Sequence, residues 1–259
     1  MRYDKNLHVS KVAIIVVVCI IIAQLVLAKG FAKTITVDDD LLDFPKANYI
    51  RIKDALKNAN NGDRIVVYSG KYPEYLEIQK SVELIGIGYP EVLGIEIKSD
   101  KVLVKGFYIT FSGIQIRSSK SGIVDSNKIS CPNRFSIGIQ TSDIAEYRIA
   151  NNTLYCAFGI VIEGQDNIIE NNTILWRVPD TFPGIWIQGN NNEIVLNTIK
   201  SKSSGISVDG NGNILWGNIV DSSSPLATAF DLDGSYNFVF LNSFKFSKIV
   251  DTVKNSVKE

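Results

Sequence analysis

The chain has 259 residues, 45% of them hydrophobic, which is enough for a packed core and excludes a disordered protein. Its 27 basic and 27 acidic residues balance, and without Arg2, Lys5, Lys11 and Asp4 of the first 28 residues they number 24 and 26. A chain with this near-neutral charge has no excess of Lys and Arg to bind nucleic acid, so no nucleic-acid partner is expected.

Residues 12–28 form an apolar run broken by Gln24, after a basic flank at 1–11. The 17 residues of this run are the lower limit for crossing a hydrocarbon core of about 30 Å. They also exceed the apolar region of about 7 to 15 residues in a usual signal peptide. We therefore predict either an uncleaved transmembrane anchor or a cleaved signal segment. In both cases residues 1–11 stay in the cytoplasm and the rest is extracytoplasmic, at the cell surface or secreted.

Residues 29–49 are predicted to form a linker with a first strand. A helix is predicted over 52–59, because Asn60, Asn61, Gly62 and Asp63 stop the helical pattern there. Short segments with strand-like alternation follow at 64–68, 76–78, 82–85, 95–97 and 102–109.

Two sequence motifs then repeat in phase. A small residue followed by alternating apolar residues begins at Gly113, Gly138, Gly159, Gly184, Gly205 and Ala229, with steps of 25, 21, 25, 21 and 24 residues. An Asn between apolar positions recurs at Asn127, Asn152, Asn172, Asn197, Asn218 and Asn242, with steps of 25, 20, 25, 21 and 24. Two motifs that share one irregular step pattern indicate a single repeated structural unit.

A coil of about 22 residues built from short strands explains this period, because stacked coils bury the apolar side that one coil cannot bury alone. The sequence therefore predicts an all-β parallel solenoid over 50–246, with the recurrent Asn at a corner. The helix at 52–59 is expected to cover one open end. Ile249, Val250, Val253 and Val257 have helical spacing, so residues 247–259 are expected to cap the other end or to form a tail.

The stretch 52–88 resembles the opening of right-handed parallel β-helix proteins of the pectate-lyase-like superfamily, in particular the NosD-type, CASH-domain branch. The motifs that carry the resemblance are Gly62-Asp63, Ser69-Gly70-Lys71-Tyr72, Glu74, Lys80 and Gly86. The resemblance implies a right-handed solenoid and a carbohydrate-related or surface role. It does not extend to copper delivery, because the one His, His8, lies before the apolar run. The Gly-His-Gly motif of the polygalacturonase-like branch is also missing.

An outer strip follows from the period of 2, because residues next to the inward Ile positions point outward. One column contains Gln115, Gln140, Val161, Trp186, Ser207 and Asp231, and the next contains Arg117, Ser142, Glu163, Gln188, Asp209 and Asp233. Amide and carboxylate groups beside an indole suit a polysaccharide. We predict carbohydrate binding by Gln115, Gln140, Glu163, Trp186 and Gln188. The alternative for Trp186 is packing under the loop 177–183.

Asp209, Asp231 and Asp233 are expected to lie close together on neighbouring coils. Carboxylates that approach closely either raise one pKa, which suits general acid catalysis, or bind a cation such as Ca²⁺. A solvated acidic patch is the third interpretation. No other cofactor is expected.

Two further pairs are predicted from their places in the repeat. Cys131 and Cys156 each follow a repeat Asn by four residues, so they should lie on adjacent coils as a disulfide or as two buried thiols. Asn151 and Asn171 each begin an Asn-Asn-Thr sequon and are candidate glycosylation sites, although stacked corners leave little room for a glycan.

Taken together, the sequence favours a non-enzymatic surface β-helix protein, anchored or secreted. Its partner would be a polysaccharide or another component of the cell envelope, for which it acts as a binding protein or scaffold. The alternative is a polysaccharide lyase or glycoside hydrolase that uses the acidic cluster at Asp209, Asp231 and Asp233.

Overall fold

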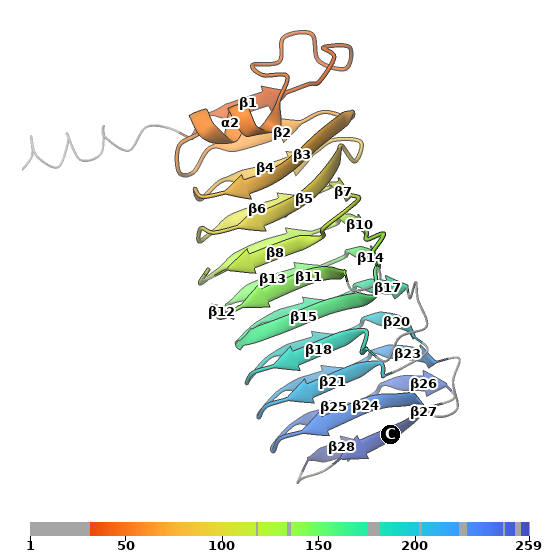
Figure 1. Cartoon of the computed structure of the whole chain (residues 1–259). Helices are drawn as coiled ribbons and strands as arrows, with labels where there is room; N and C mark the ends of the chain where they lie inside the picture. The colour runs from red at the N-terminus through yellow and green to blue at the C-terminus, as the bar shows by residue number, and fades with distance from the viewer. Residues whose placement is uncertain are drawn as a thin grey trace, which may run out of the picture. The chain divides into compact units, whose positions relative to one another are not determined.

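Short parallel strands stack coil upon coil in this protein (Figure 1). The structure is a computed structural model that describes residues 32–117, 119–133, 136–175, 182–201, 204–222, 227–245, 247–251 and 255–258. The apolar run 12–28 lies outside these residues. Among the helices that are described, none has the length and apolar character needed to span a membrane.

An eleven-stranded parallel sheet contains one strand from each coil. In spatial order its strands are β1 (Thr34–Val37), β2 (Arg64–Val67), β4 (Glu83–Gly86), β6 (Val102–Lys105), β9 (Gly122–Asp125), β13 (Tyr147–Ala150), β16 (Ile168–Glu170), β19 (Glu193–Val195), β22 (Ile214–Trp216), β25 (Phe238–Phe240) and β28 (Ser256–Lys258). Because the ladder continues from β2 to β25 without a break, the prediction of a parallel solenoid is confirmed. This parallel β-solenoid is consistent with a right-handed β-helix.

A second, seventeen-stranded sheet is composed of two ladders that long strands such as β5 join. The strip ladder consists of β3 (Lys71–Ile78), β5 (Glu91–Ile97), β8 (Ile114–Arg117), β11 (Ile137–Ser142), β12 (Ile144–Ala145), β15 (Phe158–Gln165), β18 (Ile185–Gln188), β21 (Ile206–Asp209), β24 (Ala227–Asp233) and β27 (Ser247–Asp251). The short-strand ladder consists of β7 (Tyr108–Ile109), β10 (Lys128–Ser130), β14 (Thr153–Tyr155), β17 (Thr173–Leu175), β20 (Thr198–Ser201), β23 (Ile219–Ser222) and β26 (Ser243–Lys245).

The core is a set of stacked apolar columns inside the solenoid. The predicted inward column of the strip ladder is confirmed, because all six of its residues are 0% exposed: Ile114, Ile139, Ile160, Ile185, Ile206 and Phe230. Each pairs in register with its counterpart one coil away. Burying one such side chain contributes about 1.5 to 3 kcal/mol, so the columns supply the main driving force for stacking.

The predicted Asn corner forms a ladder of buried amides, which we call the first Asn ladder. Its members are Asn127, Asn152, Asn172, Asn197, Asn218 and Asn242. Each of the first five donates from its backbone N–H and its Nδ2 to the Oδ1 of the next member, over separations of 25, 20, 25, 21 and 24 residues. These separations are the steps that the sequence predicted.

A second Asn ladder was not predicted. It lies at another corner of the coil, before the strands of the eleven-stranded sheet, and contains Asn167, Asn192, Asn213, Asn237 and Asn255. Its separations of 25, 21, 24 and 18 residues follow the same coils. In the preceding coil Tyr147 takes the place of the Asn and donates its backbone N–H to Asn167 Oδ1.

Helix α2 (Ile52–Asn58) occupies the range where a helix was predicted and packs against β1, β2 and β3. The buried carboxylate of Glu74 accepts the backbone N–H groups of Ile52 and Lys53 at 3.1 and 3.0 Å, at the helix N-terminus. Lys80 Nζ donates to three carbonyls at the C-terminal end, including Ala59 O at 2.6 Å. Two residues of the resemblance motif therefore hold this helix in place.

The described part of the C-terminal segment forms strands. Residues 247–251 form β27 and residues 256–258 form β28, although the apolar residues there have helical spacing. The exposed edges of β24 and β25 supply hydrogen-bond partners, and these strands pair with them in parallel. Because Ile249 and Val257 also satisfy the period of 2, the free edges decide the conformation.

Cys131 and Cys156 form a disulfide between adjacent coils, with their Cα atoms 4.8 Å apart. This spacing confirms the predicted coil alignment.

Candidate functional site

The predicted columns lie along the strands of the strip ladder, which Figure 1 shows stacked coil upon coil. Val161 departs from the predicted outward orientation, because it is buried at 4% exposed. Register pairs join Gln115 to Gln140, Gln140 to Val161, and Val161 to Trp186. In the second column Glu163 pairs with Gln188, and Gln188 with Asp209. The structure therefore brings all five predicted carbohydrate-binding residues onto one face of adjacent coils, and each of the five is half-buried.

Two hollows lie on this face where β8, β11 and β15 meet. One has a volume of about 230 Å³ and the other about 70 Å³, and Gln115 and Gln140 line both. The larger hollow adds Phe111, Asn133 and Ser136, and the smaller adds Arg117, Ser142 and Glu163. We call these two hollows the polar band, because they present amide, hydroxyl, guanidinium and carboxylate groups side by side.

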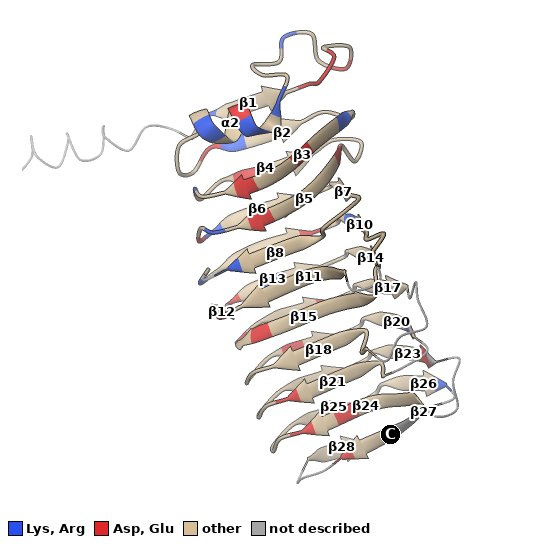
Figure 2. Ribbon diagram, viewed as in Figure 1, with Lys and Arg blue, Asp and Glu red and all other residues tan. Residues whose placement is uncertain are grey.

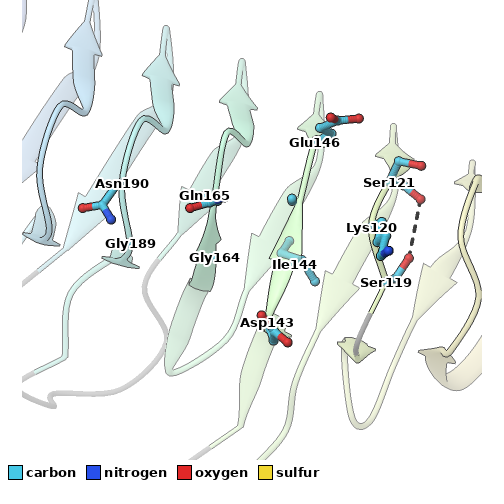
Figure 3. Close-up of a pocket in the computed structure, with 11 residues that line it drawn as sticks. Ser119, Lys120, Ser121, Asp143, Ile144, Glu146, Gly164, Gln165, Gly189 and Asn190 are labelled. Carbon is cyan, nitrogen blue, oxygen red and sulfur yellow. Dashed lines mark hydrogen bonds between the residues drawn. The ribbon is translucent and has the colours of Figure 1, made fainter.

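A groove of about 670 Å³ lies where the strip strands turn towards the eleven-stranded sheet. Figure 3 shows that successive coils contribute polar side chains to the groove, among them Lys120, Asp143, Gln165 and Asn190. Asp143 and Glu146 flank the two-residue strand β12 and have positive φ angles of 51° and 52°. The two repeat motifs do not include the turn residues that line this groove, so the sequence pattern did not predict it.

Charge divides the strip into two halves (Figure 2). Near the N-terminal end Lys98 pairs with Glu77 at 2.8 Å and with Glu96 at 2.9 Å, and Arg117 pairs with Glu96 at 2.9 Å. Hydrogen bonds from Lys98 and Gln79 hold the pKa of the exposed Glu77 below its usual value. From β11 to β24 the strip strands contain Glu and Asp but no Lys or Arg, so this half is acidic.

Trp186 is half-buried and lies in register between Val161 and Ser207. The loop that would cover it under the alternative interpretation falls largely outside the described residues. Its described end includes Phe182, which stacks on Phe158 with ring centroids 3.8 Å apart. Both interpretations of Trp186 therefore stay predictions.

The predicted acidic cluster is in register but spread out. Asp209 pairs with Asp233, and Asp231 pairs with Ser207 in the neighbouring column. In the part of the chain that the structure describes, the three carboxylates with oxygens within 4.8 Å of one another are Asp38, Asp39 and Asp40 rather than this cluster.

The two sequon asparagines are exposed and stand outside the first Asn ladder. Asn171 Nδ2 donates to Asn151 Oδ1 at 2.6 Å, and Asn151 Nδ2 donates to Asp125 Oδ1 at 2.7 Å. Burial raises the pKa of Asp125, but hydrogen bonds from Asn151 and Lys105 outweigh this and hold it below its usual value. Both acceptor amides are thus engaged in an external polar stack, and glycosylation stays a prediction.

No family model matches the chain, and no curated protein matches it.

Proposed function

We propose that this chain is an exported, membrane-anchored β-helix surface protein of the NosD-type, CASH-domain branch that binds carbohydrate on the polar band. The observation that carries the proposal is the pair of hollows that share Gln115 and Gln140 on three adjacent coils. The parallel solenoid supports it, because a rigid ladder holds these side chains on a fixed, flat face.

The chemistry of the band suits a sugar. An amide offers both a donor and an acceptor, so Gln115 and Gln140 can bind adjacent hydroxyl groups of one residue. Glu163 and Ser142 add an acceptor and a hydroxyl at the same hollow. Trp186, two coils beyond Gln140, offers a ring face on which a further sugar unit of the same chain can stack.

The charge of the strip defines the glycan class. The strands from β11 to β24 are acidic, so a polyuronate meets like charge along the strip. A neutral or amine-bearing polysaccharide avoids this repulsion. We therefore propose a neutral or cationic glycan of the cell envelope as the partner.

Retention of the full chain on a panel of immobilised neutral, cationic and polyuronate glycans, measured in mild detergent, tests the proposal. The double variant Gln115→Ala/Gln140→Ala should lower the affinity for the retained glycan about tenfold, since each lost hydrogen bond is worth about 0.5 to 1.5 kcal/mol. Trp186→Ala should weaken retention if stacking contributes.

Gln79→Ala provides the matched control, because Gln79 is an exposed glutamine outside both hollows of the band. Equal loss in the control and in the double variant would contradict the assignment to the band. Failure of the wild-type chain to bind any glycan would refute carbohydrate binding itself. An assay of the same panel for released reducing ends tests the lyase or hydrolase alternative at Asp209, Asp231 and Asp233.

A further inference from the structure

Three consecutive aspartates follow β1 in the first coil of the solenoid. Asp38 is 0% exposed, Asp39 is half-buried and Asp40 is exposed, so the row leads from the core edge to solvent. One carboxylate oxygen from each lies within 4.8 Å of the others. Two ligands bound to one Ca²⁺ ion at about 2.4 Å can be at most about 4.8 Å apart, so the three oxygens can share such an ion.

Backbone donors hold each of these carboxylates by one oxygen. The bonds are Phe44 N to Asp38 Oδ2 at 2.5 Å, Lys71 N to Asp39 Oδ2 at 2.9 Å, and Leu42 N to Asp40 Oδ1 at 2.9 Å. The second oxygen of each aspartate accepts none of these bonds. The triad is therefore oriented before any ligand arrives, and each member keeps an oxygen for one.

Asp38 Oδ1 is the feature that indicates a ligand. Among the described residues, Asp38 Oδ1 is the one buried side-chain nitrogen or oxygen atom without a hydrogen-bond partner. A buried carboxylate oxygen without a partner is costly, and a bound cation removes that cost. The ion pairs between described residues include none of the three aspartates, so no described Lys or Arg forms an ion pair with them.

The residues around the triad fit this charge. A Cβ at Gly70 would overlap Asp39 Oδ1, so only glycine leaves room for this carboxylate beside the backbone. The hydroxyl of Tyr72 accepts the N–H of Asp39 at 3.1 Å and donates to Tyr68 O at 3.0 Å.

We propose that Asp38, Asp39 and Asp40 bind one Ca²⁺ ion. Carboxylate oxygens are the ligands that Ca²⁺ prefers, and it accepts flexible geometry with water in the remaining positions. Mg²⁺ demands near-ideal octahedral geometry at about 2.0 to 2.1 Å and dehydrates reluctantly, so three protein carboxylates in one row favour the larger ion. The ion ties the loop 38–49 to the first coil beside α2. This site is independent of the carbohydrate proposal.

Calorimetric titration of the EDTA-treated full chain with CaCl₂, in mild detergent, tests the site. The expected result is one Ca²⁺ per chain and weaker binding of MgCl₂. Asp38→Asn should lower the Ca²⁺ affinity at least about tenfold. Asp40→Asn provides a second variant, because Asp40 is exposed and its replacement does not disturb the core. Tb³⁺ emission sensitised by the nearby tyrosines reports the same site by a separate signal.

The matched control is Asp209→Asn/Asp233→Asn, which removes two carboxylates of the other acidic cluster that was predicted as a candidate cation site. This variant should keep the Ca²⁺ affinity of the wild type. Absence of Ca²⁺ binding by the wild-type chain would overturn the proposal. So would a loss of binding in the control with full binding in Asp40→Asn. Circular dichroism in EDTA verifies that each variant is folded.

Discussion

Replacing Asn172 with alanine removes one buried amide from the middle of the first Asn ladder. Asn172 Nδ2 donates to Ile149 O at 2.8 Å and to Asn197 Oδ1 at 3.0 Å. Its Oδ1 accepts the backbone N–H and the Nδ2 of Asn152, each at 3.0 Å. At about 1 kcal/mol for each of four bonds, the free energy of unfolding should fall by about 4 kcal/mol. The backbone N–H of Asn152 loses its partner in a site that is 1% exposed, which adds to the cost.

Asn171→Gly is the matched control one residue away. Asn171 is exposed, and its side chain donates to Asn151 on the outside of the coil. Its φ of 49° suits glycine, so this replacement adds no backbone strain. The free energy of unfolding should change by no more than about 0.5 kcal/mol.

Urea unfolding of the full chain, followed by far-ultraviolet circular dichroism, measures both variants. A loss below about 1 kcal/mol for Asn172→Ala, or an equal loss for Asn171→Gly, would refute the idea that the buried ladder stabilises the stack. A broader transition for Asn172→Ala would show that the solenoid then unfolds in separate blocks of coils.

Two other predictions follow from buried groups. Cys131→Ser/Cys156→Ser should lower the free energy of unfolding by about 3 kcal/mol, because the disulfide closes a loop with a separation of 25 residues. Thiol titration of the unreduced, denatured chain should find neither of these two cysteines free. Burial raises the pKa of Tyr147 from 10.0 to about 12, with its hydroxyl 2.8 Å from Ser119 Oγ. The folded state therefore holds this proton more tightly, so stability is unaffected below pH 10 and falls as the pH rises from 10 to about 12. Thermal unfolding should show a weaker decline over this range for Tyr147→Phe, and an identical decline would contradict the assignment.

The repeat could be predicted because its signals are physical requirements of every coil. A buried corner amide must find partners in the coils above and below, so Asn127 and its equivalents recur at each step. The inward Ile of the strip ladder recurs for the same reason. The second Asn ladder carries an equal signal, since Asn192, Asn213 and Asn237 each precede a strand.

The errors have a physical explanation too. In 247–259 the spacing of Ile249 and Val257 fits both periods, and pairing with β24 and β25 selects the strand. The groove at Asp143 and Glu146 is lined by turn residues that differ from coil to coil, so no periodic pattern predicts it. The Asp38 triad depends on Gly70 and Lys71, which lie more than 30 residues further along the chain. Such a contact appears only when the first two coils are stacked.

The Asn ladders keep neighbouring coils aligned although the coils differ in length. Successive members of the first ladder make the same bonds whether their separation along the chain is 20, 21, 24 or 25 residues. A chain built in this way can gain or lose residues in a loop beside the strip while every Asn of the ladder keeps its hydrogen-bond partners. Insertion of a complete coil likewise preserves all bonds except those at the junction. Evolution can therefore vary the loops beside the strip ladder, or the length of the solenoid, without redesigning the interior.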